Sequence, residues 1–456
     1  MSNRMQENSA AERWTQPSRR SVLKMSGVGL AAGTSGIAGC VGTLGGNSVD
    51  PVNEDSLTLW HAMGGGLGET LNKIGDEFES ETGISIEMEF QDSYENVLTN
   101  FLGALDSGKV PDFAQIDSLF AQQVLDTGSV EPVENFLGSE FPIDDYLPNV
   151  TEFFAVDGTL QSLPFNNSNA IMYYNQSAFE AAGLDPDDPP ATVEEVYNAS
   201  QALVDAGVVD AGITWPNHVW FVEHWYSTAG QLMFDAKNGH DGEPTTLLTD
   251  NATAEGLYEW WRRMADEDLF INPGIEAWGE ATSAFLNENA AMLLTSTAFV
   301  AGARSGAEDN GFAVDNAFYP TVGEDRVGPV IGGASFFVPA DLPDDRREDV
   351  GAFLEYMSSP AVQKQWHKGT GYYPIRQAAV DELESEGWFE ENPMFRTAMD
   401  QLTTAESSPA TKRMLVGPAR QCQQIVQNTS VDIFNGTVGV EEGLGEMKAD
   451  VESQFE

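Results

Sequence analysis

The sequence predicts an α/β protein with two lobes. Strand-like and helix-like segments alternate along most of the chain, a pattern typical of parallel sheets covered by helices. The chain has 456 residues, of which 41% are hydrophobic. A single hydrophobic core rarely grows beyond roughly 250 to 300 residues. We therefore expect two hydrophobic cores, one in each lobe.

The first lobe is expected to begin near Ser56. Apolar and polar residues alternate over 84–90, with the period of two that marks a half-buried strand. The expected strands cover 57–60, 84–90 and 113–116. The expected helices run to Phe78 after a glycine break at 64–66, from about 94 to 105, and from Ser118 onward.

The second lobe is expected to begin after residues 163–166, with 170–174 as a strand that crosses between the lobes. Thr192 is placed to cap a helix that ends near Ala206, because its hydroxyl can accept a hydrogen bond from the first turn. Further helices are expected over 218–229, 253–267 and most of the chain after 345, and strands over 291–294 and 330–338. We assign 56–165 and 291–340 to the first lobe, and 166–290 and 341–456 to the second.

The N-terminus has the features of an export signal. Residues 18–24, SRRSVLK, resemble the twin-arginine motif, with Val22 in place of its aromatic residue. A mildly apolar run over 25–39 is too short to span a bilayer, and 37–40, IAGC, resembles a lipobox. We expect a twin-arginine signal over 1–39, a lipid anchor at Cys40, a flexible tether over 40–55, and a location on the outer face of the cytoplasmic membrane.

The charge balance argues against nucleic-acid binding. The chain has 72 acidic and 22 basic residues and a formal net charge of -50, so it has no basic stripe to neutralise phosphates. Such a surface repels itself in dilute buffer unless salt screens it. We interpret the composition as that of a protein from an extreme halophile.

The sequence contains no pattern that indicates catalysis, a metal or a cofactor. It has two cysteines and five histidines, with neither an H-E-x-x-H nor a G-x-S-x-G motif. We expect Cys422 to be a small buried hydrophobe and the protein to need no metal or cofactor. An exported phosphodiesterase or glycosidase is the competing class, which would require metal ligands or paired carboxylates.

Several short motifs occur in an order that resembles the family 1 extracellular solute-binding proteins of ABC importers. The motifs are residues 60–63 (WHAM), 163–168 (LPFNNS), 173–175 (YYN), 181–186 (AAGLDP), 332–335 (GGAS) and 366–372 (WHKGTGY). The resemblance spans nearly the whole chain after the signal and is closest to members that bind sn-glycerol 3-phosphate. It implies a two-lobed periplasmic-binding-protein-like fold with crossing hinge strands, a ligand cleft between the lobes, and permease subunits as partners.

The resemblance also implies a set of ligand contacts. By position they fall on Tyr94, Ser168, Ser296, Gly333 and Tyr372, with Trp60 near the site. The family's glutamate falls on Ser118, beside Asp117, and its late arginine, suited to gripping phosphate, falls on Gln423. Arg420 lies three residues before Gln423, on the same face if this segment is helical, and could take the place of that arginine.

These residue types suit a polyol or a sugar phosphate. Hydroxyl groups can bond a polyol, and Gly332-Gly333 would let backbone amides approach an anion closely. Tryptophans at 220, 225, 260, 261 and 278 are expected mostly in the core, although one could stack on a sugar. We expect lobe closure on glycerol-3-phosphate or a glycerophosphodiester. A neutral sugar or polyol is the alternative, because the late arginine is replaced.

Overall fold

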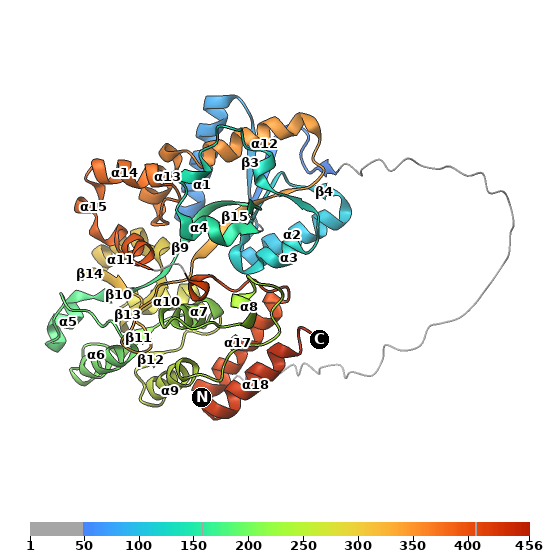
Figure 1. Cartoon of the computed structure of the whole chain (residues 1–456). Helices are drawn as coiled ribbons and strands as arrows, with labels where there is room; N and C mark the ends of the chain where they lie inside the picture. Colours follow the sequence, from blue (N-terminus) through green and yellow to red (C-terminus); the bar gives the residue numbers. More distant parts are fainter. Residues whose placement is uncertain (1–48, 157, 406–407) are drawn as a thin grey trace, which may run out of the picture. The chain divides into compact units, whose positions relative to one another are not determined.

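The computed structural model describes residues 49–156, 158–405 and 408–456, and every structural statement below refers to them. The expected export signal and Cys40 lie outside these residues. Two separate sheets, each surrounded by helices, form two lobes (Figure 1). This arrangement confirms the expected two-lobed α/β fold.

The first lobe is built on a six-stranded sheet in the order β3-β2-β5-β15-β6, with β9 also paired to β15. β2 is parallel to β3 and β5, whereas β15 is antiparallel to β5, β6 and β9. The strands are β2 (Leu57–His61), β3 (Ile86–Phe90), β5 (Phe113–Asp117), β6 (Val130–Glu131), β9 (Leu163–Ser168) and β15 (Gly332–Pro339). The helices are α1 (Gly65–Thr82), α2 (Tyr94–Ser107), α3 (Ala121–Leu125), α12 (Asp344–Met357) and α13 (Pro360–Thr370).

The second lobe is built on a five-stranded sheet in the order β12-β11-β13-β10-β14. The strands are β10 (Ala170–Asn175), β11 (Ala211–Thr214), β12 (Phe270–Ile271), β13 (Ala290–Ser296) and β14 (Val314–Phe318). The helices on or beside it are α5 (Gln176–Ala182), α6 (Val193–Asp205), α7 (Val219–Thr228), α8 (Asp235–Asn238), α9 (Ala252–Asp266), α10 (Trp278–Leu286), α11 (Val300–Asn310), α16 (Thr397–Thr403), α17 (Ala419–Phe434) and α18 (Val440–Glu452). Thr192 caps α6 in a reciprocal capping box with Glu195.

Tryptophans form the core of the second lobe and connect it to the cleft. Trp215 stacks on Trp260 with ring centroids 5.6 Å apart and meets Trp225 edge-on at 5.5 Å. Trp225 lies on α7, and the same helix carries Trp220 at its first turn. The packing of α7 into this core therefore fixes where Trp220 lies in the cleft.

The two lobes are joined by strands that pass directly from one sheet to the other. β9 ends at Ser168 in the first sheet, and β10 begins at Ala170 in the second. A second crossing joins β14 to β15, where Gly332 pairs with Ser168. The remaining elements, from both sides of this hinge, are α4 (Pro148–Phe154), β7 (Ala155–Val156), β8 (Thr159–Leu160), α14 (Gln377–Ser385) and α15 (Trp388–Glu391).

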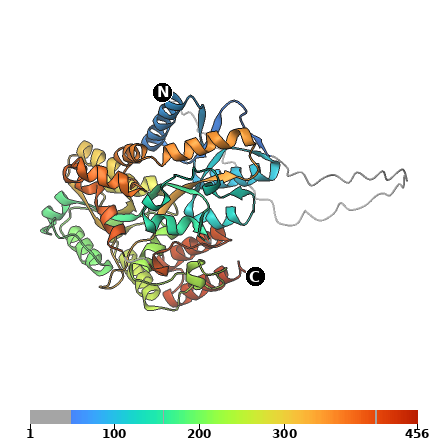
Figure 2. The same cartoon turned by 45° about the horizontal axis from the view of Figure 1, so that its top comes forward.

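Two segments lie in the lobe opposite to the expected one. β13 and β14, expected within the first-lobe block 291–340, pair with β10 in the second sheet. Helix α12, expected in the second lobe, packs on the first beside α1 (Figure 2). The ring of Phe353 on α12 lies 5.2 Å from that of Phe78 and 4.8 Å from that of Phe113. This long-range packing leaves no trace in local periodicity.

The folded body begins before the expected end of the tether. β1 (Asp50–Pro51) pairs in parallel with β4 (Lys109–Val110), and the N–H of Val52 donates to the carbonyl of Val110 at 2.8 Å. Residues 49–52 therefore belong to the first lobe rather than to a free linker. No helix in the described part of the chain combines the length and apolarity needed to cross a membrane.

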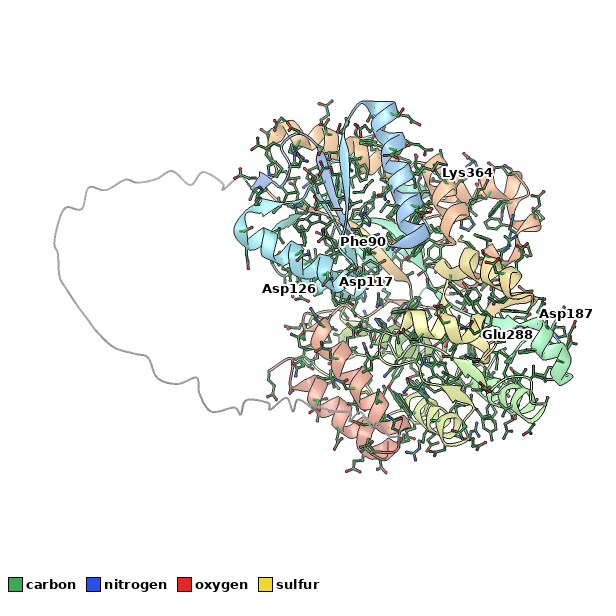
Figure 3. All side chains as sticks on the ribbon, turned by 180° about the vertical axis from the view of Figure 1, so that it is seen from behind. Phe90, Asp117, Asp126, Asp187, Glu288 and Lys364 are labelled. Carbon is green, nitrogen blue, oxygen red and sulfur yellow. The ribbon has the colours of Figure 1, made fainter. Side chains whose placement is uncertain are left out.

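The surface of the folded body is rich in carboxylates, as the composition indicates. Asp126 lies on the first lobe, and Asp187 and Glu288 lie on the second, all three exposed (Figure 3). Asp117 lies instead at the junction of the lobes, at the end of β5 (Figure 3). This difference in position separates a solvated charge from one that belongs to the cleft.

Candidate ligand-binding site

A cavity of about 510 Å³ lies between the two lobes. The first lobe lines it with the end of β5 and the start of α2, and the second lobe with the residues before and at the start of α7 and α10. The hinge strands contribute Ser168 and Gly333. Five sequence-predicted positions line the cavity, namely Tyr94, Ser168, Ser296, Gly333 and Tyr372. A cavity of this size suits a small solute enclosed by both lobes.

Two tyrosines form one wall of the cavity. Tyr94 is the first residue of α2, whose N-terminus is capped by Ser93, and its hydroxyl accepts a hydrogen bond from Asn166 Nδ2 at 2.8 Å. Tyr372 stacks on Trp366, with ring centroids 5.5 Å apart. Burial, together with the neighbouring Tyr372 and Asp117, raises the pKa of Tyr94 well above its ordinary value. Both hydroxyls are therefore neutral hydrogen-bonding groups over the physiological pH range.

The hinge requires glycine at position 333. Gly333 has φ +90° and pairs with Asn167, and a Cβ atom there would lie 1.8 Å from the carbonyl oxygen of Asn166. A Cβ on Gly332 would lie 2.4 Å from the indole ring of Trp220. The two glycines therefore allow the crossing strands and the Trp220 ring to come into close contact at the cavity wall.

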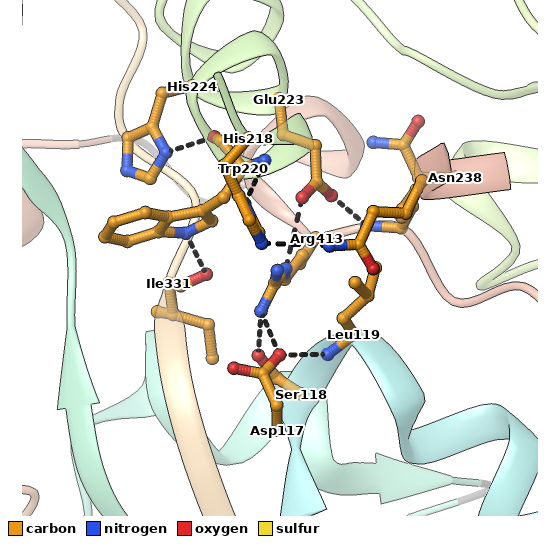
Figure 4. A network of polar contacts seen from close by, with 12 residues as sticks. Asp117, Ser118, Leu119, His218, Trp220, Glu223, His224, Asn238, Ile331 and Arg413 are labelled. Carbon is orange, nitrogen blue, oxygen red and sulfur yellow. Dashed lines mark hydrogen bonds and ion pairs between the residues drawn. The ribbon is translucent and has the colours of Figure 1, made fainter. Parts of the chain in front are cut away.

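Arg413 is the one arginine or lysine among the described residues that line the cavity. Its side chain is only 2% exposed. Nη1 donates to Asp117 Oδ1 at 2.7 Å and to Ser118 Oγ at 2.6 Å, and Nε donates to Glu223 Oε2 at 3.1 Å (Figure 4). Nη2 makes no hydrogen bond to any described residue. Its two N–H groups are therefore free to bind an anion in the cavity.

A left-handed turn in the second lobe holds the backbone around Arg413. Asn238, with φ +58°, donates from Nδ2 to the Lys412 carbonyl at 3.0 Å and accepts from the Leu415 N–H at 2.8 Å. His240 Nε2 bonds the Arg413 carbonyl at 2.9 Å, and Glu223 Oε1 accepts from the Met414 N–H at 2.9 Å. The guanidinium is thus mounted on a segment that is fixed on both sides.

The carboxylates around Arg413 are buried. Burial raises the pKa of Asp117 and of Glu223, and the Arg413 charge partly opposes the shift in both groups. Asp117 belongs to β5 of the first lobe and Glu223 to α7 of the second. Arg413 therefore joins the two lobes through a buried ionic cluster, an arrangement in which loss of one partner is costly.

Aromatic rings form the wall contributed by the second lobe. The centroid of Trp278 lies 5.5 Å from that of His218 and 6.3 Å from that of Trp220. Burial, with a further contribution from the Arg413 charge, lowers the pKa of His218 to about 3. His218 is therefore neutral, and this wall offers flat apolar faces without a positive charge.

Comparison with known proteins decides the family. Residues 73–397 match the model of a family described as bacterial extracellular solute-binding protein. The chain belongs to this family. The sn-glycerol-3-phosphate-binding periplasmic protein UgpB of Pectobacterium atrosepticum is 28% identical over 390 residues, which cover 83% of this chain and 86% of that protein. The protein of the same name from Yersinia pestis is 29% identical over 378 residues, which cover 81% and 85%.

Solved structures share the fold of this solute-binding protein. UgpB from Mycobacterium tuberculosis, in complex with glycerophosphocholine, superposes with a TM-score of 0.75 at 19% identity, covering 88% of this chain and 98% of that one. The GacH receptor of Streptomyces glaucescens, solved unliganded and with acarbose, gives a TM-score of 0.73 at 18% identity, covering 89% and 98%. At these identities the likeness concerns the fold.

The other sequence-predicted residues of this solute-binding protein lie outside the cavity lining. Ser118 lies behind Asp117 and accepts from Arg413, and Trp60 lies in β2. Gln423 Nε2 donates to Glu276 Oε1 at 2.9 Å and reaches the cavity only through that neighbour. Arg420 is exposed on α17.

Arg413 was missed by sequence analysis because its segment is not helical. It lies ten residues before Gln423 (423 - 413) in the connection between Thr411 and α17. Such connections vary in length between relatives, so counting residues onward from Tyr372 misplaces the positions beyond the connection. An arginine close before a helix, beside an unassigned acidic partner at Asp117, was the available signal.

Proposed function

We propose that this protein is the extracytoplasmic subunit of an ABC importer and that it captures glycerol-3-phosphate or a glycerophosphodiester by lobe closure. The observation that carries the proposal is the buried Arg413 guanidinium in the cavity lining, with Nη2 unbonded to any described residue. Planar guanidinium groups suit phosphate oxygens, because two N–H donors can bind them side by side.

The rest of the cavity supports the same class of solute. Tyr94 and Tyr372 offer neutral hydroxyls, and Gly333 brings backbone to the cavity without a side chain. These groups can bond glycerol hydroxyls and phosphate oxygens. The curated relatives named above are glycerol-3-phosphate-binding proteins, and one structural relative holds glycerophosphocholine.

A neutral sugar or polyol is the second candidate ligand. It is favoured by Trp220 and Trp278, whose rings are of the kind that stack on sugars, and by the acidic residues of the cavity lining. Other structural relatives were solved with acarbose and with α-D-tagatose. The two candidates differ in charge, so a binding assay separates them.

The experiment is identification of the solute that copurifies with the protein from its native source. Mass spectrometry of the denatured protein should release a glycerol phosphate ester. Calorimetry of the emptied protein should then show binding of that ester and none of free glycerol or maltose. Recovery of a neutral sugar, with no phosphate ester bound in the titration, would transfer the assignment to the second candidate.

We also propose that export follows the twin-arginine route and that a lipid at Cys40 anchors the protein to the outer face of the cytoplasmic membrane. The proposal is supported by SRRSVLK at 18–24 and IAGC at 37–40, and by a folded body that begins by Val49. Cys40→Ser should move the folded protein from the membrane fraction to the medium. Retention of Cys40→Ser in the detergent phase would contradict the anchor.

A further inference from the structure

We infer that the solute carries a cationic group beside its phosphate, and that Glu95 and Glu276 hold this cation between the lobes. This inference rests on the proposed function, because it concerns the same cavity, and it narrows the solute to a zwitterionic phosphodiester of an amino alcohol. The argument starts from the charges on the cavity wall.

The cavity wall has more negative than positive charges. Four carboxylates line it, namely Asp92, Glu95, Asp117 and Glu276, against the single guanidinium of Arg413. Asp117 and Glu223 already share Arg413. A phosphate monoester would bring up to two more negative charges into this enclosed space, where like charges repel more strongly than in bulk water. A zwitterionic diester would bring one negative and one positive charge.

Glu95 and Glu276 approach the cavity from opposite lobes. Glu95 is the second residue of α2 in the first lobe, and Glu276 precedes α10 in the second. Burial raises the pKa of Glu276, and the negative charge of Glu95 raises it further. The two carboxylates are therefore close enough to repel each other across the cavity. A cation between them would relieve this repulsion.

Neither carboxylate has a cationic partner. Glu95 makes no hydrogen bond or ion pair with any described residue. Glu276 Oε1 accepts from Gln423 Nε2 at 2.9 Å and from Gln427 Nε2 at 3.0 Å, and both donors are neutral amides. Arg420 is exposed, and it lowers the pKa of Glu276 through its charge without forming an ion pair with it.

The backbone at Glu276 is also fixed in an unusual conformation. Glu276 has φ +54°, which non-glycine residues rarely adopt, and its N–H donates to the Asn217 carbonyl at 3.1 Å. Strain of this kind persists where neighbouring contacts hold a side chain in place, and it is frequent at binding sites. The carboxylate is therefore presented in one fixed orientation.

The tryptophans complete the cation site. Trp278 is two residues beyond Glu276, and its ring lies 6.3 Å from that of Trp220 between centroids. Both indoles line the cavity. A quaternary or primary ammonium is attracted both to indole faces and to carboxylates, so this wall matches the head group of choline or ethanolamine esters.

The test compares three solutes by calorimetry at one fixed salt concentration. Glycerophosphocholine carries the cation, glycerophosphoglycerol is the matched diester without it, and glycerol-3-phosphate is the monoester. Wild-type protein should bind glycerophosphocholine at least about tenfold more tightly than glycerophosphoglycerol. Glu276→Gln and Glu95→Gln should each reduce the affinity for glycerophosphocholine about five- to tenfold and leave that for glycerophosphoglycerol unchanged or higher.

The matched control is Glu259→Gln, which removes one exposed carboxylate from α9 outside the cavity lining. It should leave all three affinities unchanged, and melting curves should show that every variant is folded. Equal binding of the two diesters by wild type, with equal effects of both cavity variants on each, would overturn the cation site and leave the proposed function intact. Binding of a neutral sugar with no phosphate ester bound would instead overturn the proposed function itself.

Discussion

Arg413 of the second lobe and Asp117 of the first are joined by an ion pair with 2.7 Å between Nη1 and Oδ1. The pair closes the cavity at the end of β5, and Glu223 holds the other side of the same guanidinium. Asp117 is thus at once part of the ligand cavity and part of the contact between lobes. A solute phosphate that binds Arg413 would act on the same cluster.

Removal of the Asp117 charge should loosen the contact between the lobes. In Asp117→Asn, Arg413 keeps Glu223 and the Ser118 hydroxyl, so we expect a moderate loss of about 1–3 kcal/mol in unfolding free energy. We also expect a larger radius of gyration without ligand. Denaturant unfolding and small-angle X-ray scattering measure the two effects. The control is Asp76→Asn on the exposed face of α1. If both variants match wild type, the pair does not hold the lobes together.

A side chain at position 333 should damage the hinge. In Gly333→Ala the new Cβ would lie 1.8 Å from the Asn166 carbonyl oxygen at φ +90°, so the strands must separate. We expect a loss of more than about 2 kcal/mol in unfolding free energy. Gly103→Ala, in open space on α2, should stabilise by about 0.5–1 kcal/mol. A Gly333→Ala protein as stable as wild type would show that the hinge can relax around the methyl group.

Acid should destabilise the fold through its buried histidines. The pKa of each of the five histidines is lowered, chiefly by burial. For His224 it falls from 6.5 to about 3. The unfolded chain therefore takes up protons that the folded chain refuses. The stability from each histidine is fully present above its unfolded pKa, and it is lost as pH falls towards the folded value, at up to about 1.4 kcal/mol per pH unit.

Denaturant unfolding between pH 7.5 and 5.5 measures this effect. The raised pKa values of Asp117 and Glu223 act in the opposite direction, so comparison of wild type with His224→Gln isolates one histidine. The variant should show a shallower fall in stability with pH than wild type. Parallel curves for the two proteins would mean that His224 does not titrate on unfolding.

Salt should stabilise the protein strongly. The net charge is -50, and the distance over which exposed charges act shrinks from about 10 Å at 0.1 M salt to about 3 Å at 1 M. We expect the melting temperature to rise steeply across this range of potassium chloride. A melting temperature that is constant over the range would contradict the interpretation of the acidic surface as adapted to high salt.

The parts of the structure that depend on local sequence could be predicted. Alternation over 84–90 gives β3, and the hydroxyl of Thr192 with Glu195 gives the start of α6. The lobe assignment of α12 depends on Phe353 reaching Phe78 and Phe113, contacts far apart in the sequence. No local pattern records such a contact.

The candidate site divides in the same way. Tyr94, Ser168, Gly333 and the other hinge positions belong to segments whose length the resemblance preserves, and they line the cavity. Arg413 lies beyond a connection of variable length and depends on the turn at Asn238 for its position. Glu276 likewise enters the cavity through a loop conformation, with φ +54°, that the sequence does not reveal.

The most direct test of the central claim is calorimetry of Arg413→Gln with glycerophosphocholine and glycerol-3-phosphate. A charge-assisted contact to phosphate contributes about 1.5–3 kcal/mol, so losing it should weaken binding of both esters roughly ten- to a hundredfold. Arg413→Lys, which keeps the charge without the planar fork, should show a smaller loss, and Arg420→Gln, on the exposed face of α17, should change little. Wild-type affinity for both esters in a folded Arg413→Gln protein would contradict a phosphate site at Arg413.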